Sequence, residues 1–332
     1  MTASDPARPG PAPATRPAKL DYAAPWGARG YVTDLDGPVH WIEFNPGTSE
    51  QAQGQGENQP PVVFVHGLGG SHLNWCLIGP QLAAGRRAVA LDLRGFGLTP
   101  GLRANSTVQA NTRLLDRFIT EVIGTPVILV GNSMGGLISI RETAANPDAV
   151  SGVVLLDPAL PLPPQKPDWP VTGQFLLYTL PGLAPLAVAR LLSRVSPEEA
   201  VRQLIKLCFA DPSRADPEMT KAEVALAARR HPATAAQASA RARIFLAAAR
   251  SLLRVLSLRW DYNAMMAGID VPVLLVGGEA DRLVPVAAVR QAAARNPRWE
   301  SVILADVGHA PQLEVPDVVA ATIRDWLSRH FS

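Results

Sequence analysis

The chain has 332 residues, of which 47% are hydrophobic and 18% are charged, and its formal net charge is +2. This composition is sufficient for a large buried core and excludes a disordered or collagen-like chain. The small net charge and the absence of runs of like charge give no support to nucleic-acid binding. We therefore expect one large domain that carries an insertion.

The first 29 residues are rich in proline, alanine and glycine and contain no apolar segment of the kind found in a secretory signal. We predict that residues 1–29 form a disordered leader. No uncharged apolar run reaches the roughly 18 residues that a membrane span needs. Cys76 and Cys208 stand in apolar surroundings, which favours free thiols in a reducing compartment over a disulfide or a metal pair. These features predict a cytoplasmic protein without a stable membrane anchor.

The next part of the chain alternates short apolar runs with helix-like segments. It begins with a β-hairpin whose turn is at Asp36-Gly37. Two of the apolar runs that follow end directly in glycine-containing motifs. The predicted elements are the hairpin over 30–45, a polar loop over 46–59, strands over 61–65, 87–93, 128–130 and 150–156, and helices over 106–122 and 137–145.

The pattern changes between Pro158 and Ala267, where no strand is predicted and the sequence is rich in alanine, leucine and arginine. Residues 158–265 contain 14 Lys and Arg and 8 Asp and Glu, a net charge of +6. A basic surface there could steer an anionic substrate, although solvated helix faces explain the same pattern more simply. Beyond this insert, the predicted elements are strands over 271–276 and 301–304 and helices over 286–296 and 315–331.

Apolar strands that alternate with helices are typical of a mostly parallel sheet covered by helices on both faces. Functional sites in such sheets lie at the carboxyl ends of the strands. The candidate motifs all follow a predicted strand, so this fold would bring them to one edge of the sheet.

The stretch Gly131-Asn132-Ser133-Met134-Gly135 follows a predicted strand, precedes a predicted helix and fits the pattern G-x-S-x-G. In that context the serine lies on a sharp, strained turn and projects its hydroxyl above the sheet, while the glycines let neighbouring elements pass close by. The same five letters also occur by chance in ordinary turns, so the flanking strand and helix matter. Ser133 is the candidate nucleophile.

A serine nucleophile requires a base and a group that orients the base. His309 is the best candidate base because it follows the last predicted strand, on a loop before the closing helix. Asp281 follows the penultimate strand and is the preferred orienting carboxylate, since the chain order is then Ser, Asp, His. Glu279 and Asp157 are alternative acids by position. The other histidines are His40, His66, His72, His231 and His330, of which His72 could line a pocket.

Acyl transfer also needs hydrogen-bond donors for the developing oxyanion. We predict the backbone N–H of Met134 as one donor and that of Leu68 as the second, with Gly69 as the alternate. The turn over 66–70 is not a nucleotide-binding loop, because the third glycine of G-x-G-x-x-G is missing and no GK[ST] follows. No spacing typical of metal ligands occurs in the sequence, and no cofactor is predicted. The residues predicted to contact substrate are Gly67, Gly69, Trp75 and Phe96.

Five motifs in this order, HGLGG, DLRGFGLT, GNSMGG, GGEADRLVP and VGHAPQLEVP, resemble the α/β-hydrolase superfamily over roughly residues 30–332. Within it, the chain is similar to the branch of serine esterases and carbon–carbon hydrolases that carry a cap. The resemblance implies an eight-stranded, mostly parallel sheet with helices on both faces. It implies a core over 30–157 and 268–332, a helical cap over 158–267, and a triad of Ser133, His309 and Asp281. The related haloalkane dehalogenases and epoxide hydrolases carry aspartate at the position of this serine.

The predicted function is hydrolysis of a small to medium carboxylic ester through an acyl-enzyme, with a small-molecule substrate and no nucleic-acid partner. An alternative is hydrolysis of a carbon–carbon bond in vinylogous 1,5-diketones, which GNSMGG and a basic insert would suit. HGLGG departs from the HGxGPG that is more usual in that second family. A receptor that binds a ligand and turns it over slowly is an alternative of another class. The sequence predicts neither the natural substrate nor the oligomeric state.

Overall fold

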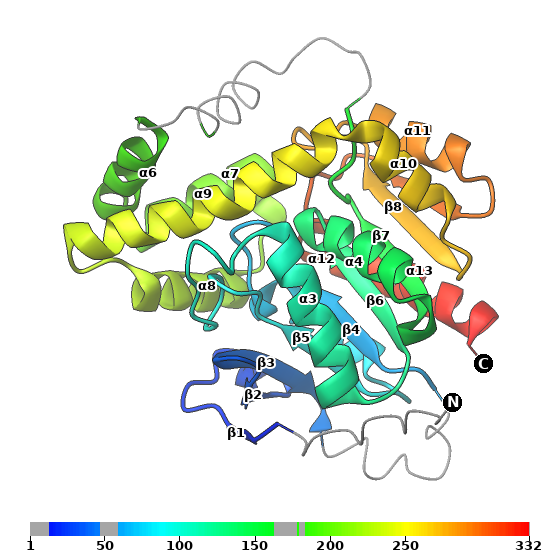
Figure 1. The fold of residues 1–332 in the computed structure, drawn as a ribbon, viewed down its shortest axis with the longest axis horizontal. Coiled ribbons are helices and arrows are strands. Elements are labelled where there is room, and N and C mark those ends of the chain that lie inside the picture. Colours follow the sequence, from blue (N-terminus) through cyan, green and yellow to red (C-terminus); the bar gives the residue numbers. More distant parts are fainter. Residues whose placement is uncertain (1–12, 47–58, 163–177, 179–182, 332) are drawn as a thin grey trace, which may run out of the picture.

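The computed structural model describes residues 13–46, 59–162, 178 and 183–331 (Figure 1). Residues 1–12 of the predicted leader, most of the predicted polar loop and much of the proline-rich start of the insert lie outside these ranges. Within them, no helix combines the length and the apolar character that a membrane crossing requires.

A sheet of nine strands, counted over the described residues, forms the centre of the molecule (Figure 1). The strand order is β1-β2-β3-β5-β4-β6-β7-β8-β9. The six strands β4 to β9 are parallel to one another, and β1, β2 and β3 extend the edge next to β5 in antiparallel pairing. The strands are β1 (Thr15–Pro17), β2 (Ala28–Asp34), β3 (Pro38–Phe44), β4 (Val62–Val65), β5 (Ala88–Leu91), β6 (Val127–Asn132), β7 (Val150–Leu156), β8 (Val273–Gly278) and β9 (Glu300–Leu304). The predicted mostly parallel α/β fold is confirmed.

Helices cover both faces of the sheet. Buried residues of α3, α4, α10 and α11 belong to one hydrophobic cluster, and those of α2 and α13 belong to a second one. Helices α6 to α10 all lie between β7 and β8 in the chain, where the insert was predicted. The helices are α2 (Gly79–Leu82), α3 (Val108–Phe118), α4 (Met134–Ala145), α6 (Leu183–Arg194), α7 (Pro197–Cys208), α8 (Pro217–Arg230), α9 (Ala235–Ser257), α10 (Arg259–Ala267), α11 (Val286–Arg295), α12 (Pro311–Glu314) and α13 (Pro316–His330).

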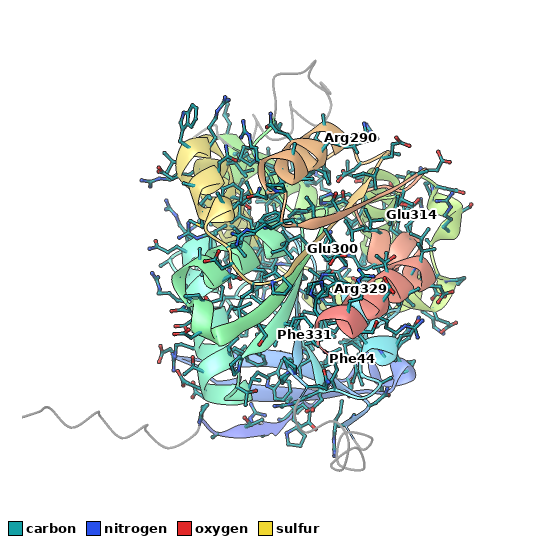
Figure 2. All side chains as sticks on the ribbon, turned by 90° about the vertical axis from the view of Figure 1, so that its right-hand side faces the viewer. Phe44, Arg290, Glu300, Glu314, Arg329 and Phe331 are labelled. Carbon is teal, nitrogen blue, oxygen red and sulfur yellow. The ribbon has the colours of Figure 1, made fainter. Side chains whose placement is uncertain are left out.

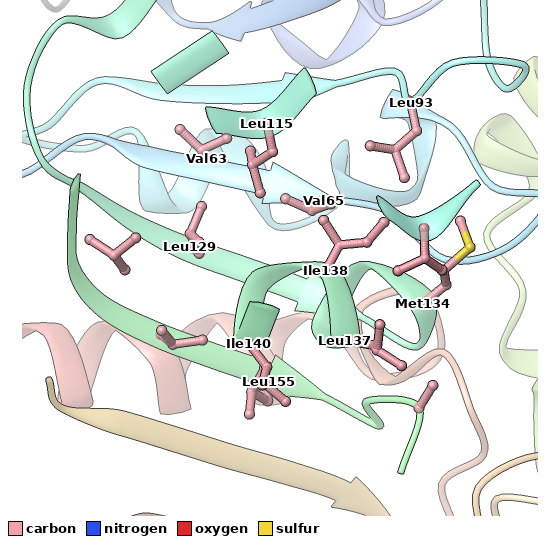
Figure 3. Close-up of a cluster of buried hydrophobic side chains, with 14 of the residues drawn as sticks. Val63, Val65, Leu93, Leu115, Leu129, Met134, Leu137, Ile138, Ile140 and Leu155 are labelled. Carbon is pink, nitrogen blue, oxygen red and sulfur yellow. The ribbon is translucent and has the colours of Figure 1, made fainter. Parts of the chain in front are cut away.

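Successive residues of the central strands alternate between the two hydrophobic clusters. Val63 and Val65 of β4 lie in the first cluster with Leu129 of β6, whereas Val62 and Phe64 lie in the second. This period of two is expected for strands that are buried on both faces. Figure 3 shows the first cluster, in which α4 packs over the strands.

The closing helix α13 is fixed to the end strand by packing and by charge. Arg329 of α13 and Glu300 of β9 lie close together (Figure 2), with 2.5 Å between Arg329 Nη2 and Glu300 Oε2. An ion pair this exposed contributes about 0–1 kcal/mol to stability. Trp326 of the same helix is fully buried, and burial of a large apolar side chain contributes about 1.5–3 kcal/mol. Packing of α13 on the sheet therefore contributes more to stability than this ion pair does.

Strand β1 was not predicted, because it lies in the segment expected to be a disordered leader. Its three residues are exposed and carry no apolar pattern, so the strand is held by backbone pairing to β2. The hydroxyls of Thr15 and Thr33 are 2.8 Å apart, and Asp21 accepts hydrogen bonds from the N–H groups of Ala23 and Gly30. The leader prediction is therefore wrong for residues 13–29, and the sheet has nine strands in the described residues where eight were expected.

The carboxylate of Asp92, just after β5, joins three separate segments of the chain. It accepts hydrogen bonds from Nδ1 of His40 on β3 at 2.8 Å, from Nδ1 of His72 at 2.9 Å and from the N–H of Leu98 at 2.8 Å. The N–H of His72 also donates to it, at 2.7 Å. Burial alone would raise the pKa of Asp92, but His72 and His40 hold it well below its usual range. The ionised carboxylate therefore links the antiparallel edge to the segment that follows the glycine-rich turn.

We predict that Asp92→Asn lowers the free energy of unfolding by about 3 kcal/mol at pH 7, because it removes a buried acceptor for several N–H donors. A lowered folded-state pKa stabilises the protein above the unfolded-state pKa, about 3.9, and this contribution disappears as the pH falls toward the folded-state value. Urea unfolding of both proteins between pH 7 and pH 3 should show the difference shrinking with acid. Asp325→Asn, on the exposed face of α13, is the control and should change stability by less than about 0.5 kcal/mol. Equal effects of the two variants would contradict the prediction.

Candidate active site

Ser133 lies on a strained turn between the end of β6 and the start of α4. Its backbone angles are φ 53° and ψ −118°, in a region that non-glycine residues rarely occupy and that costs about 1–3 kcal/mol. The chain is forced through this turn by close contacts. A Cβ added to Gly135 would lie 1.9 Å from the carbonyl oxygen of Val65, and one added to Gly131 would lie 2.7 Å from the backbone of Gly135. Only glycine fits at either position, as the G-x-S-x-G pattern indicated.

Asp281 and His309 come together from two different loops. Nδ1 of His309, on the loop after β9, is 2.7 Å from Oδ2 of Asp281, on the loop after β8. The other carboxylate oxygen, Oδ1, accepts the N–H groups of Leu283 at 2.7 Å and Val284 at 3.0 Å. Because Nδ1 donates to the carboxylate, Nε2 of the neutral imidazole is the nitrogen that can accept a proton.

Ser133 and His309 line the same pocket. Within the described residues, no hydrogen bond joins the Ser133 hydroxyl to the His309 ring. The two residues are instead linked through the side chain of Asn132, whose Nδ2 donates to the carbonyl oxygens of His309 at 3.0 Å and Leu156 at 2.9 Å. Bonds between a nucleophile and its base are often long in unliganded enzymes and shorten when substrate binds.

The alternative acids and bases lie in different environments. Glu279 is half exposed and pairs with Arg290, with 3.3 Å between Glu279 Oε1 and Arg290 Nη2. His66 is buried, with Nδ1 2.8 Å from the Gly67 carbonyl oxygen and Nε2 accepting the Leu93 N–H at 3.1 Å. Burial lowers the pKa of His66 to about 4, so this ring stays neutral and serves as a local link. Among the remaining histidines, His40 and His72 contact Asp92, His330 contacts Glu300, and His231 follows α8.

The glycine-rich turn that carries Leu68 and the first residue of α4, Met134, both adjoin Ser133. A Cβ added to Gly67 would be 3.1 Å from Cβ of Ser133, so the glycine-rich turn passes directly beside the candidate nucleophile. In the part of the chain that the structure describes, the N–H groups of Leu68 and Met134 donate no backbone hydrogen bond. Met134 is also the first residue of α4, where the helix dipole favours negative charge.

A pocket of about 820 Å³ opens above the ends of the strands. Helices α7, α8 and α9 supply much of its wall, and the glycine-rich turn supplies Gly67, Leu68 and Gly69. The wall is mostly aliphatic and aromatic, which suits an apolar ligand. Residues from the three helices include Val201, Leu204, Met219, Phe245, Leu252 and Leu256.

Trp75 and Phe96, which were predicted to contact substrate, are not among the described residues that line this pocket. The Trp75 ring is fully buried and stacks on Phe64, with 5.0 Å between ring centroids. Phe96 packs edge-on against His66 at 5.9 Å. Both rings are buried in the core, so their apolar surface packs against the protein and is not exposed to the pocket. His72 is likewise buried against Asp92 and does not line the pocket.

Three charged side chains line the pocket besides Asp281, as far as the described residues show. They are Asp216 and Glu223, which come from the start and middle of α8, and Arg282 next to Asp281. Burial raises the pKa of Glu223 to about 7. An acyl group that carries its own carboxylate would therefore meet acidic side chains in this part of the pocket.

Glu314, at the end of α12, holds the loop that carries His309 and was not identified from the sequence. Its carboxylate accepts the N–H of Gly308 at 2.8 Å and those of Ala210 and Asp211 at 3.1 and 3.0 Å. Arg214 completes this set, with Nη1 3.3 Å from Glu314 Oε1. Glu314 lies within the motif VGHAPQLEVP, but no role was predicted for it. Asn132, in contrast, is the first variable position of G-x-S-x-G, so its place beside the site could have been anticipated.

One group of side chains could in principle ligate a metal, as far as the described residues show: His40, His72 and Asp92, whose ligand atoms lie within 4.8 Å of one another. Both oxygens of Asp92 already accept N–H donors, two of them from the backbone. Hydrogen bonding accounts for the position of the Asp92 carboxylate, and the three residues lie outside the pocket that contains Ser133.

Comparisons with known proteins found several similar sequences. The chain is 26% identical to the dihydrolipoyllysine-residue acetyltransferase component of the acetoin cleaving system of Pseudomonas putida over 83% of its own length, but it spans only 65% of that relative. It is 28% identical to a pimeloyl-[acyl-carrier protein] methyl ester esterase of Aromatoleum aromaticum, covering 81% of this chain and 98% of the relative. It is 26% identical to a 2-hydroxy-6-oxononadienedioate/2-hydroxy-6-oxononatrienedioate hydrolase of Cupriavidus pinatubonensis, covering 82% and 88%.

The solved structure of a thermophilic esterase from Thermogutta terrifontis has the same fold, with a TM-score of 0.65 and 22% identity over 91% of this chain and 97% of that one. The model of the alpha/beta hydrolase family matches residues 62–322, which include every strand from β4 to β9. The match covers most of the sequence, and the chain therefore belongs to the α/β-hydrolase family of enzymes.

Proposed function

We propose that the protein is a serine hydrolase that cleaves a small to medium carboxylic ester through an acyl-enzyme. The observation that carries the proposal is the arrangement around one pocket: Ser133 on a strained turn, His309 hydrogen-bonded to Asp281, and the backbone N–H groups of Leu68 and Met134 next to the serine. These are the nucleophile, base, orienting acid and oxyanion donors that acyl transfer requires.

In the proposed mechanism, Oγ of Ser133 attacks the ester carbonyl carbon while Nε2 of His309 takes the serine proton. Asp281 stabilises the imidazolium through Nδ1–H. The N–H groups of Leu68 and Met134 bind the oxyanion of the tetrahedral intermediate. The intermediate collapses when His309 protonates the leaving alkoxide, and the alcohol departs. Water, deprotonated by His309, then attacks the acyl-enzyme and releases the acid and free Ser133.

We further propose that the insert over residues 158–267 acts as a cap on the core. Support comes from the pocket wall, because α7, α8 and α9 line it together with the loops after β4, β6, β8 and β9. Several arginines of the insert bind protein groups in the described residues. Arg230 donates to the Gly95 carbonyl oxygen, Arg250 to that of Tyr178, and Arg214 to Glu314. These contacts support a structural use for part of the positive charge of the insert.

Hydrolysis of a carbon–carbon bond is the second candidate, because the relative from Cupriavidus pinatubonensis is a hydrolase of a dienedioate and a trienedioate. Such substrates carry two carboxylates. Besides Asp281, the described pocket wall has two acidic residues, Asp216 and Glu223, and one basic residue, Arg282. This balance favours a neutral apolar acyl group over a dianion, and we therefore prefer the ester hypothesis.

We predict that the protein hydrolyses p-nitrophenyl esters with a maximum at one acyl length, and that Ser133→Ala lowers kcat by at least about 10⁴-fold. Initial rates measured by release of p-nitrophenol over a series of acyl lengths would check this. Ser193→Ala, on the exposed part of α6, is the matched control and should retain wild-type activity. Wild-type rates in Ser133→Ala would contradict the assignment. If wild type were inactive on every ester, a ring-fission dienoate would be tested next, followed by ligand binding without turnover.

The acidic pocket wall predicts selectivity against acidic acyl groups. At pH 8, Glu223 is largely ionised, since its pKa is about 7. Glu223→Gln should then raise kcat/KM about tenfold for an ester whose acyl chain ends in a carboxylate, because one like charge is removed. At pH 6, where wild-type Glu223 is mostly protonated, the gain should shrink.

The control for this comparison is a neutral ester of the same chain length, for which Glu223→Gln should change kcat/KM by less than about twofold. Equal gains on the neutral and acidic esters would show that the substitution acts on packing and not on charge.

A further inference from the structure

A second carboxyl group, that of Asp157, lies directly beside Asp281. Asp157 follows β7 and has a backbone φ of 42°, and its side chain is completely buried. Its N–H donates to the Val276 carbonyl oxygen at 2.8 Å, and its Oδ1 accepts the N–H of Gly278 at 2.9 Å. These two bonds fix Asp157 against the end of β8, at the start of the loop that carries Asp281.

The second carboxyl oxygen of Asp157, Oδ2, has no hydrogen-bond donor within the described residues, so the protonation state of the carboxyl group determines which contacts it can make. The carboxyl groups of Asp157 and Asp281 lie within interaction distance of each other. Two carboxylates in contact repel each other, and a single shared proton turns the contact into a hydrogen bond.

The surroundings place that proton on Asp157. Asp281 accepts three N–H donors, from His309, Leu283 and Val284, and these stabilise a negative charge on it. Asp157 accepts one N–H and has no contact with solvent. Burial, followed by the charge of Asp281, raises the pKa of Asp157 well above its usual range.

The other titratable groups that face this pair add little positive charge. Glu314 on α12 acts on Asp157 as a further negative group, and it is itself paired with Arg214. The Cys208 thiol on α7 lies near Asp281, and burial raises its pKa to about 12, so it remains neutral. His309 faces the pair through Asp281.

We propose that Asp157 is a positioning residue that remains a neutral acid and donates its Oδ2–H to the carboxylate of Asp281. This hydrogen bond would hold Asp281 in the orientation in which it accepts Nδ1–H of His309. Its effect on turnover rests on the proposed function, whereas its protonation state can be measured without any substrate.

Asn is the test substitution, because its amide has the same donor and acceptor pattern as a protonated carboxyl group. In Asp157→Asn, Oδ1 can still accept the Gly278 N–H and Nδ2–H can still donate to Asp281, so kcat should stay within about threefold of wild type. Asp157→Leu fills a similar volume without a donor. It should lower kcat by about 10- to 100-fold with KM nearly unchanged, as expected for loss of one hydrogen bond to a charged group.

The substrate-free readout is the thermal midpoint of wild type and Asp157→Asn from pH 4 to pH 8. A raised folded-state pKa stabilises the protein fully below the unfolded-state pKa, about 3.9, and this contribution declines as the pH rises toward the folded-state value. The Asn variant has no such group, so its Tm relative to wild type should increase with pH. Asp270→Asn, at an exposed site paired with Arg298, is the control and should show no such trend.

The outcomes separate this proposal from the proposed function. Two outcomes would overturn the proposal, because an ionised Asp157 predicts both. One is a difference in Tm between Asp157→Asn and wild type that does not change with pH. The other is a loss of kcat in Asp157→Asn as large as that in Asp157→Leu. A Tm difference that rises with pH in a protein that hydrolyses no ester would support the neutral acid and reject the ester function.

Discussion

The site depends on how closely the start of α4 approaches the ends of β4 and β7. A Cβ on Gly135 would overlap the Val65 carbonyl oxygen, and a Cβ on Gly136 would lie 2.7 Å from the Pro158 side chain. With the helix start this close to both strands, the connection from β6 has room only for a tight turn. Ser133 is at its apex with positive φ, and the glycine-rich turn after β4 passes against it. The nucleophile position is thus a result of backbone packing.

The polar loops around this turn are held by acidic side chains that accept hydrogen bonds from backbone N–H groups. Asp281 binds two amides of its own loop, Asp157 binds Gly278, and Glu314 binds Gly308 together with two amides near α7. A buried carboxylate that accepts several N–H donors is both stabilised and fixed in position. These hydrogen bonds connect the loops at the strand ends, while the pocket wall from α7, α8 and α9 is mostly apolar and is shaped by side-chain packing.

The sequence was sufficient for those parts of the molecule that are encoded locally. The strand and helix rhythm and the G-x-S-x-G turn depend on neighbouring residues, and the pairing of Asp281 with His309 follows from the rule that strand ends share one edge. Trp75 and Phe96 show the limit, because an aromatic residue next to a motif can either line a pocket or fill the core, and only tertiary packing decides. Strand β1 is held by backbone pairing to β2, and Glu314 binds the N–H groups of Ala210 and Asp211, which lie far away in the chain. No local pattern records either interaction.

Asp92, with His40 and His72, connects the antiparallel edge of the sheet to the segment that follows the glycine-rich turn. None of the described lining residues comes from residues 13–46, yet His40 of β3 shares the Asp92 carboxylate with His72, which follows the glycine-rich turn. A chain reduced to the six parallel strands and their helices would keep all of these lining residues but lose one of the anchors behind that turn. The hairpin therefore belongs to the smallest unit that could be transplanted with the site intact, and a minimal version of this scaffold would have to include it.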